Sequence, residues 1–67
     1  MRTRQEIQEE RIVTLVESLR SQGPGTVSAV RNRLWRTTKA RVRADDFAEA
    51  RRRGLVAMVD RGRYSAA

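Results

Sequence analysis

Cysteine and histidine are both absent from this 67-residue sequence. Their absence excludes disulfide bonds, a thiolate nucleophile, the usual zinc ligands and the imidazole that most often serves as a general base. The remaining polar residues show no spacing typical of a catalytic site, and a domain of this length has little room for a deep cleft. We therefore predict that the chain is not an enzyme and uses no cofactor or metal.

The sequence also lacks a long apolar segment. Its longest apolar run, 55–59, has five residues, whereas a helix that crosses a bilayer needs about 20. The first ten residues, MRTRQEIQEE, lack the apolar core of a secretory signal and contain acids that a transit peptide would avoid. These absences predict a protein of the cytoplasm without a membrane partner.

Positive charge, by contrast, is abundant and is concentrated in one part of the chain. The net charge of +7 results from 15 Lys and Arg against 8 Asp and Glu. Residues 1–30 are neutral in sum, so the whole excess lies in residues 31–67. Such a local excess is typical of a surface that binds a polyanion, although charge can also serve solubility alone. All basic residues but Lys39 are Arg, which suits bidentate contacts with phosphate and guanine.

A first helix is predicted over about residues 4–22. Thr3 and Glu6 form the T-x-x-E capping box that starts a helix, and the Gly-Pro-Gly segment at 23–25 ends it. The apolar positions repeat at i, i+3, i+4 and i+7, which predicts one buried face. That face consists of Ile12, Leu15, Val16 and Leu19.

A second helix is predicted over about residues 27–35, with Thr26 as its cap. Its buried face consists of Val27, Val30 and Leu34. Trp35 lies about 80° from the centre of this face, so it either closes the edge of the core or presents an exposed ring. We favour the core edge, because three apolar positions alone cover little of a small domain.

The segment RTTKARVRADDFAEARRRG allows a third helix to be placed in two ways. In one, the helix begins near Ala44, after a basic loop, and acids in its first turn suit the helix dipole. In the other, Thr38 caps a helix over 39–53, joined to the second helix by a tight turn. We favour the second, whose cations near the helix start are tolerable if a phosphate or base binds there. Its inner face would consist of Ala40, Ala44, Phe47, Ala50 and Arg51.

The last residues predict a β-hairpin over about 55–66. The sequence Asp60-Arg61-Gly62 fits a three-residue loop with glycine in the left-handed position. The expected inner face of the hairpin carries Val56, Met58 and Tyr64. The alternative is a disordered tail, because the return strand is short and ends at the terminus.

This order of elements resembles the winged helix-turn-helix DNA-binding domains over nearly the whole chain, about residues 6–65. The stretch ARRRGLVAMVDRGRY is similar to the junction where that family's recognition helix ends and its wing begins, and GTVSAVRNRL is similar to its capped second helix. The resemblance implies a single domain, 1–67, mainly α with a small β-hairpin. It identifies the superfamily but no subfamily.

The resemblance further implies double-stranded DNA as the partner. The third helix would enter the major groove by its N-terminal half, and the hairpin would reach an adjacent groove or phosphate strand. The residues that correspond to these contacts are Arg36, Thr37, Thr38, Lys39, Arg41, Val42, Arg43, Arg61 and Arg63. Val42 is expected to point outward, toward a thymine methyl group, and Arg41 or Arg43 to hold a guanine.

Three acids depart from this picture. Asp45, Asp46 and Glu49 fall on or near the outer face of the third helix, where carboxylates usually repel DNA. We expect them to cap and solvate the helix. Binding led by the basic turn and the wing is the alternative to deep insertion of the helix.

Charge and resemblance together predict a small regulator of transcription or DNA maintenance. A module of this size covers about one half-site, so specificity calls for a homodimer or repeated sites, and Ile7 with the outer face of the first helix is the candidate dimer surface. The alternative function is a winged-helix protein-interaction module that presents its arginines to an acidic partner. RNA is a less favoured partner, because the three aromatic residues do not suggest a base-stacking platform.

Overall fold

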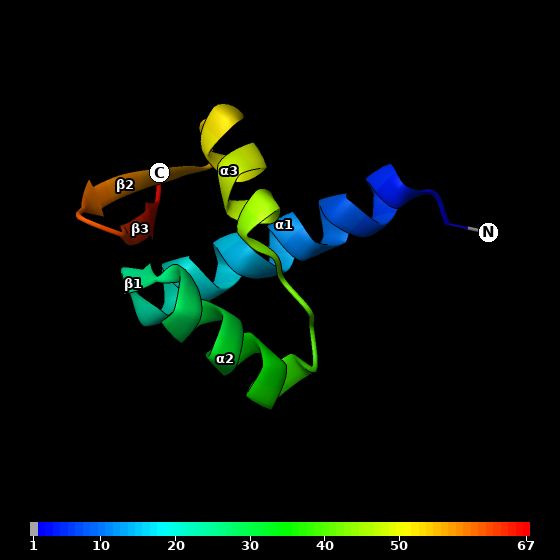
Figure 1. Cartoon of the computed structure of the whole chain (residues 1–67), viewed down its shortest axis with the longest axis horizontal. Helices are drawn as coiled ribbons and strands as arrows, with labels where there is room; N and C mark the ends of the chain where they lie inside the picture. The colour runs from blue at the N-terminus through cyan, green and yellow to red at the C-terminus, as the bar shows by residue number, and fades with distance from the viewer. Residues whose placement is uncertain (1) are drawn as a thin grey trace.

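The computed structural model describes residues 2–67, which form three helices and a three-stranded antiparallel sheet (Figure 1). In chain order the elements are α1 (Arg4–Gln22), β1 (Gly25–Thr26), α2 (Val27–Thr38), α3 (Ala44–Arg52), β2 (Val56–Asp60) and β3 (Arg63–Ala66). In Figure 1, α1 runs through the middle, α2 and α3 lie on opposite sides of it, and the sheet lies near its C-terminal end. The predicted mainly helical fold with a small β element is confirmed at this level.

The first helix begins and ends where the sequence predicts. The Thr3 hydroxyl accepts a hydrogen bond from the Glu6 backbone N–H at 3.1 Å, which caps the first turn. Gly23, at φ +86°, ends the helix and donates its backbone N–H to the Leu19 carbonyl at 3.0 Å. The predicted apolar face is buried and consists of Ile12, Leu15, Val16 and Leu19.

The second helix begins as predicted but continues beyond its predicted end. Thr26 caps it by accepting a backbone hydrogen bond at 3.2 Å, and Val30 is fully buried. The Thr38 hydroxyl donates to the Leu34 carbonyl at 2.9 Å, so Thr38 completes the last turn of α2 instead of starting a new helix. Lys39 then adopts the left-handed conformation, φ 61°, that glycine usually supplies at a helix end.

The third helix begins at Ala44, so the favoured prediction of a helix over 39–53 is wrong and the alternative start is correct. Asp46 sets this boundary, because its carboxylate accepts the backbone N–H of Arg43 at 2.9 Å and closes a capping box. Residues 39–43 form a loop between α2 and α3. We call this segment the basic loop.

The inner face of α3 is correspondingly shorter than predicted. Phe47 and Ala50 are buried, and Ala40 packs against the core from the basic loop. Ala44 and Arg51 are exposed, contrary to their predicted place on the inner face. Ala44 is the first residue of α3 instead of an interior position of a longer helix. Arg51 lies within α3, but no ion pair within residues 2–67 would offset the cost of burying its charge.

Val42 anchors the basic loop to the core. Its side chain is 2% exposed, so the expectation that it points outward toward a thymine methyl group is wrong. The backbone carbonyl of Val42 accepts a hydrogen bond from Arg31 Nε of α2 at 2.9 Å. Apolar burial and this bond together hold the loop against α2.

The sheet has the order β1-β3-β2, with β3 in the centre. Arg63 and Tyr64 are paired on both sides, Ser65 and Ala66 are paired with β2, and the alternative of a disordered tail is wrong. Thr26 of β1 lies opposite Arg63 of β3, which places the turn end of the hairpin directly beside the start of α2. Gly62 has the predicted left-handed conformation, φ 72°.

The hairpin pairing contains one irregularity. Met58 lies opposite Tyr64 and Asp60 opposite Arg63, with an irregularity at the intervening Val59. The Tyr64 ring contacts Phe47 of α3, with 5.3 Å between centroids. Met58 remains 43% exposed, so the inner face of the hairpin is narrower than predicted.

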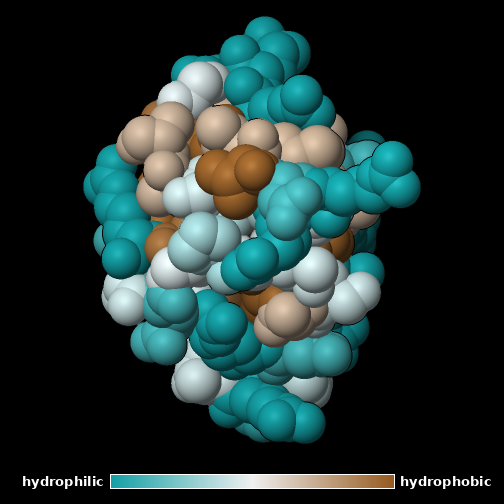
Figure 2. Space-filling view, turned by 90° about the vertical axis from the view of Figure 1, so that its left-hand side faces the viewer, coloured by the Kyte–Doolittle hydropathy of each residue, from teal (hydrophilic) through white to brown (hydrophobic). Residues whose placement is uncertain are grey.

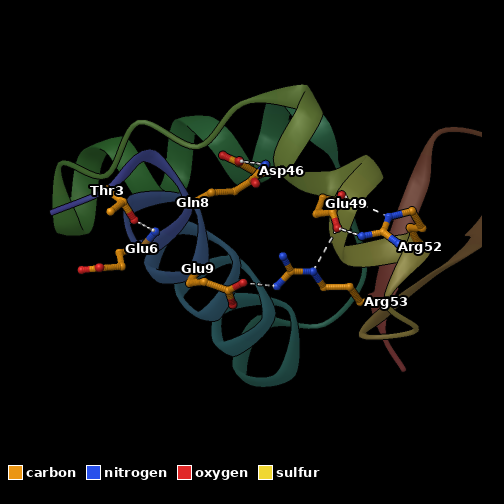
Figure 3. A network of polar contacts seen from close by, with 8 residues as sticks. All are labelled: Thr3, Glu6, Gln8, Glu9, Asp46, Glu49, Arg52 and Arg53. Atoms are coloured by element: carbon orange, nitrogen blue, oxygen red, sulfur yellow. Dashed lines mark hydrogen bonds and ion pairs between the residues drawn. The ribbon is translucent and has the colours of Figure 1, made fainter.

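Two polar clusters join α1 to α3 (Figure 3). In one, the fully buried Asp46 accepts hydrogen bonds from Arg11 Nε at 2.8 Å and from Gln8 Nε2 at 3.4 Å. In the other, Arg53 lies between Glu9, at 2.5 Å, and Glu49, at 3.0 Å. These contacts, together with the apolar core, fix the start and end of α3 on α1.

Candidate nucleic-acid interface

The acidic side chains of α1 and α3 neutralise basic residues of the same two helices. Arg11 pairs with Asp46, and both Arg52 and Arg53 pair with Glu49. Hydrogen bonds from Arg52 first, then from Arg53, lower the pKa of Glu49 from its usual 4.5. This part of the positive charge is therefore used within the fold.

The cations of α2 and the basic loop, by contrast, have no acidic partners among the residues that the structure describes. Within residues 2–67, no ion pair involves Arg31, Arg33, Arg36, Lys39, Arg41 or Arg43. All but Arg33 are exposed. The charges of the five exposed cations are directed to solvent or to a partner, whereas Arg33 lies beside Ser18 and Ser21 of α1.

The outward face of α2 has a composition of its own. Ser28, Arg31, Asn32 and Trp35 recur at i, i+3, i+4 and i+7, on a stripe beside the buried face of the helix. An open groove of about 520 Å³ lies between these side chains and residues 40–42 of the basic loop. We call it the α2 groove. Its lining combines an aromatic ring, two guanidinium groups, an amide and a hydroxyl.

Trp35 presents its ring in this groove. It is 44% exposed and lies outside the core cluster, so the preferred placement at the core edge is wrong. Lys39 Nζ lies 5.4 Å from the ring centroid, and Arg41 Cζ lies 5.2 Å from it. Each such cation–π contact at an exposed position is worth about 0.5–1 kcal/mol. The ring thus gathers two cations of the basic loop at the wall of the groove.

The structure divides the residues that were predicted to bind DNA into two groups. Arg36, Thr37 and Thr38 end α2, and Lys39, Arg41 and Arg43 follow in the basic loop with exposed side chains. Arg61 and Arg63 belong to the hairpin, which Figure 1 shows at the other end of α2.

The second helix connects these two groups. Arg63 lies opposite Thr26, directly before α2, whereas Lys39 directly follows it. Twelve helical residues span about 18 Å. The residues that were predicted to bind DNA therefore lie at the two ends of a surface. The outward face of α2 forms the middle of that surface.

The N-terminal half of α3 does not have the character predicted for a recognition helix. The predicted cations of that half lie in the basic loop, and the first turn of α3 contains Asp45 and Asp46 instead. Asp45 is exposed, and Glu49 follows one turn later beside Arg52. The outward face of α3 therefore exposes the Asp45 carboxylate to solvent near the start of the helix.

The contribution of α2 was not predicted, because only the apolar positions of that helix were assigned a role, and Ser28, Arg31 and Asn32 were not. A polar stripe with helical spacing beside the apolar one was the available signal. Nothing in the sequence pattern, however, indicated that the basic loop folds back to form the second wall of a groove.

The candidate dimer surface on α1 is not one apolar stripe. Ile7 is 40% exposed and Val13 is 54% exposed, but they lie about 120° apart around the helix. The hairpin exposes further apolar side chains, and Figure 2 shows this end of the molecule, where apolar atoms lie among hydrophilic ones. The large apolar residues exposed on or just before β2 are Leu55, Met58 and Val59.

Comparisons of the chain with protein-family models, with curated proteins and with solved structures found no match. No helix within residues 2–67 is both long and apolar enough to cross a membrane. Across the same residues, acidic side chains do not gather in a group that could hold a metal ion. The candidate site is thus characterised by its own geometry and charge.

Proposed function

We propose that this chain is a winged helix-turn-helix protein that binds double-stranded DNA and acts in the cytoplasm as a small regulator of transcription or DNA maintenance. The order of helices and strands, with a hairpin at the end, supports the proposal. So do the predicted caps at Thr3 and Thr26 and the turn glycine Gly62. The connection between α2 and α3 is longer than the tight turn expected for this family, which moves the basic residues from a helix into a loop.

The observation that carries the proposal is the absence of carboxylate partners for the six cations of α2 and the basic loop within residues 2–67. The acids that form ion pairs bind arginines outside α2 and the basic loop, so this charge is not consumed by the fold. A surface of unpaired arginines is suited to phosphate oxygens, which guanidinium groups can hold with two hydrogen bonds each.

The proposed binding mode places α2 along the duplex. Its length of about 18 Å corresponds to roughly five base pairs of B-DNA, at about 3.4 Å per step on each strand. The basic loop and Arg63 would contact phosphates at the two ends of this span. The acidic start of α3 would remain outside the contact, because Asp45 faces solvent there.

A salt titration tests the proposal directly. If about six cations each neutralise one phosphate, log affinity for a duplex should fall with log salt at a slope of about −5, since each contact contributes about −0.9. Fluorescence anisotropy with a labelled duplex measures this slope. A slope near zero would contradict the proposal.

Variants locate the surface. Replacing both Arg41 and Arg43 with Ala should reduce the slope by about 2 units. Arg51→Ala is the matched control, because Arg51 is an exposed arginine on α3, on the far side of α1 from α2. Arg61→Ala with Arg63→Ala tests the hairpin separately. Equal losses in the control and the loop variant would show general charge attraction instead of a defined surface.

A second function, protein docking, is favoured by the apolar side chains of the hairpin. Met58 is 43% exposed and Val59 is 55% exposed, and both lie beside basic residues that an acidic partner could meet. Charge reversal at Arg61 and Arg63, the arginines of the hairpin, distinguishes the two functions. Loss of partner binding by a protein that never binds DNA would favour docking. Sedimentation of the chain with and without duplex tests whether a homodimer forms on DNA.

A further inference from the structure

We infer that the α2 groove binds an unpaired nucleobase of single-stranded DNA, stacked on Trp35. The inference rests on the proposed function, because it assigns a more specific ligand to the same basic surface. It goes beyond duplex binding, since a duplex keeps the faces of its bases stacked on one another and offers only their edges. An aromatic ring in a basic groove is suited to the face of a base that has left the stack.

The exposure of Trp35 is the first observation. The sequence contains one tryptophan, and its ring is 44% exposed although the domain has few large apolar residues for its core. The ring contributes nothing to the core cluster. The protein therefore does not need the ring for packing, and its neighbours in the groove are solvent and the two cations of the basic loop, Lys39 and Arg41.

The groove beside the ring has a size and composition that suit a base. Its volume of about 520 Å³ lies within the range of about 300–1,000 Å³ typical of small-ligand sites. The buried Val42 lies behind it, which gives the groove an apolar side. Asn32 offers an amide with both donors and an acceptor, and such a group can pair with the exposed edge of an unpaired base.

Arginines beside the ring are suited to the backbone of the same strand. Arg31 uses Nε to hold the Val42 carbonyl, and a guanidinium group has further N–H donors for a phosphate. Arg41 and Lys39 now lie near the Trp35 ring. Base stacking is the stronger interaction, so an incoming base can take the place of one cation, which then remains within reach of the adjacent phosphate.

The intrinsic fluorescence of Trp35 provides the test, because it is the sole tryptophan of the chain. The probes are a short oligothymidylate, an abasic strand of equal length and charge, and a duplex. We expect the oligothymidylate to quench Trp35 and the abasic strand to leave it nearly unchanged. Trp35→Ala, which lacks this reporter, is measured by fluorescence anisotropy of a labelled oligothymidylate and should bind it about fivefold to 100-fold more weakly. Trp35→Phe should restore part of the affinity, and duplex affinity should change less than about twofold.

The outcomes separate the two proposals. If the duplex binds with a steep salt dependence while the two single strands bind equally, or while Trp35→Ala binds oligothymidylate like the parent, the groove assignment is wrong and the proposed function stands. If neither duplex nor single strand binds, the proposed function is wrong and the groove assignment is wrong with it. Tighter binding of oligouridylate than of oligothymidylate would overturn the assignment to DNA. Far-UV circular dichroism of each variant confirms that the fold is retained.

Discussion

The buried carboxylate of Asp46 provides the sharpest test of how this fold is held together. It is 0% exposed and receives hydrogen bonds from three places: Arg11 and Gln8 of α1, and the backbone of Arg43 at the end of the basic loop. Asp46→Ala removes all of them at once. The variant leaves Arg11 without its partner and the start of α3 without its cap.

The expected loss follows from these contacts. Removing one partner of a buried ion pair typically costs about 3–5 kcal/mol. The Arg11 side chain is 24% exposed and can partly rehydrate, so the lower end applies, about 3 kcal/mol. A chain of 67 residues has a total stability of roughly 3–10 kcal/mol. The substitution should therefore remove a third or more of it and lower Tm by about 12–24 °C.

Urea unfolding followed by far-UV circular dichroism measures this loss. Asp45→Ala is the matched control, because Asp45 is the adjacent carboxylate of the same helix and is exposed. It should cost less than about 1 kcal/mol, mainly through the helix dipole. If Asp46→Ala is too unstable to fold, Asp46→Asn keeps an acceptor for the Arg43 N–H and should lose about half as much. Equal stabilities of the Asp45 and Asp46 variants would refute the reasoning.

Two further predictions concern an ion pair and a helix cap. Because Arg52 and Arg53 lower the pKa of Glu49, its contribution to stability is complete above about pH 4.5 and is lost as the pH falls through the lowered value. The difference in unfolding free energy between the parent and Glu49→Gln should thus shrink in acid, and a difference that stays constant across that range would contradict the assignment. Thr26→Ala should destabilise the protein by about 1 kcal/mol, as measured by urea unfolding, because Thr26 caps α2. Thr37→Ala, at an exposed position within α2, is the control and should cost less than about half of that.

Elements with local signals were predicted well from the sequence. The start of α1 at Thr3, its end at Gly23 and the cap of α2 at Thr26 each depend on a few adjacent residues. The left-handed turn at Gly62 is of the same kind. Caps and turns are determined by contacts within three or four residues, so their chemistry is visible in the sequence itself.

The boundaries of α3, by contrast, depend on residues that are distant in the sequence. Thr38 is a good cap by residue type, yet its hydroxyl bonds back to Leu34 and completes α2. Lys39 ends that helix in the left-handed conformation, although no glycine at this position indicates such an end in the sequence. The choice of Ala44 as the start of α3 depends on Asp46, whose carboxylate is held by a residue of α1 distant in sequence.

The candidate interface shows the same division. Sequence alone determined that the excess charge lies in residues 31–67 and that α2 has one buried face, because charge and helical periodicity are properties of the residues in order. Only the tertiary structure decided which cations remain without partners and that Val42 turns inward to hold the basic loop beside Trp35. The physical reason is that the acids of α1 and α3 neutralise each other's arginines across the fold, and burial of Val42 depends on a core built from every helix. Neither effect can be read from neighbouring residues.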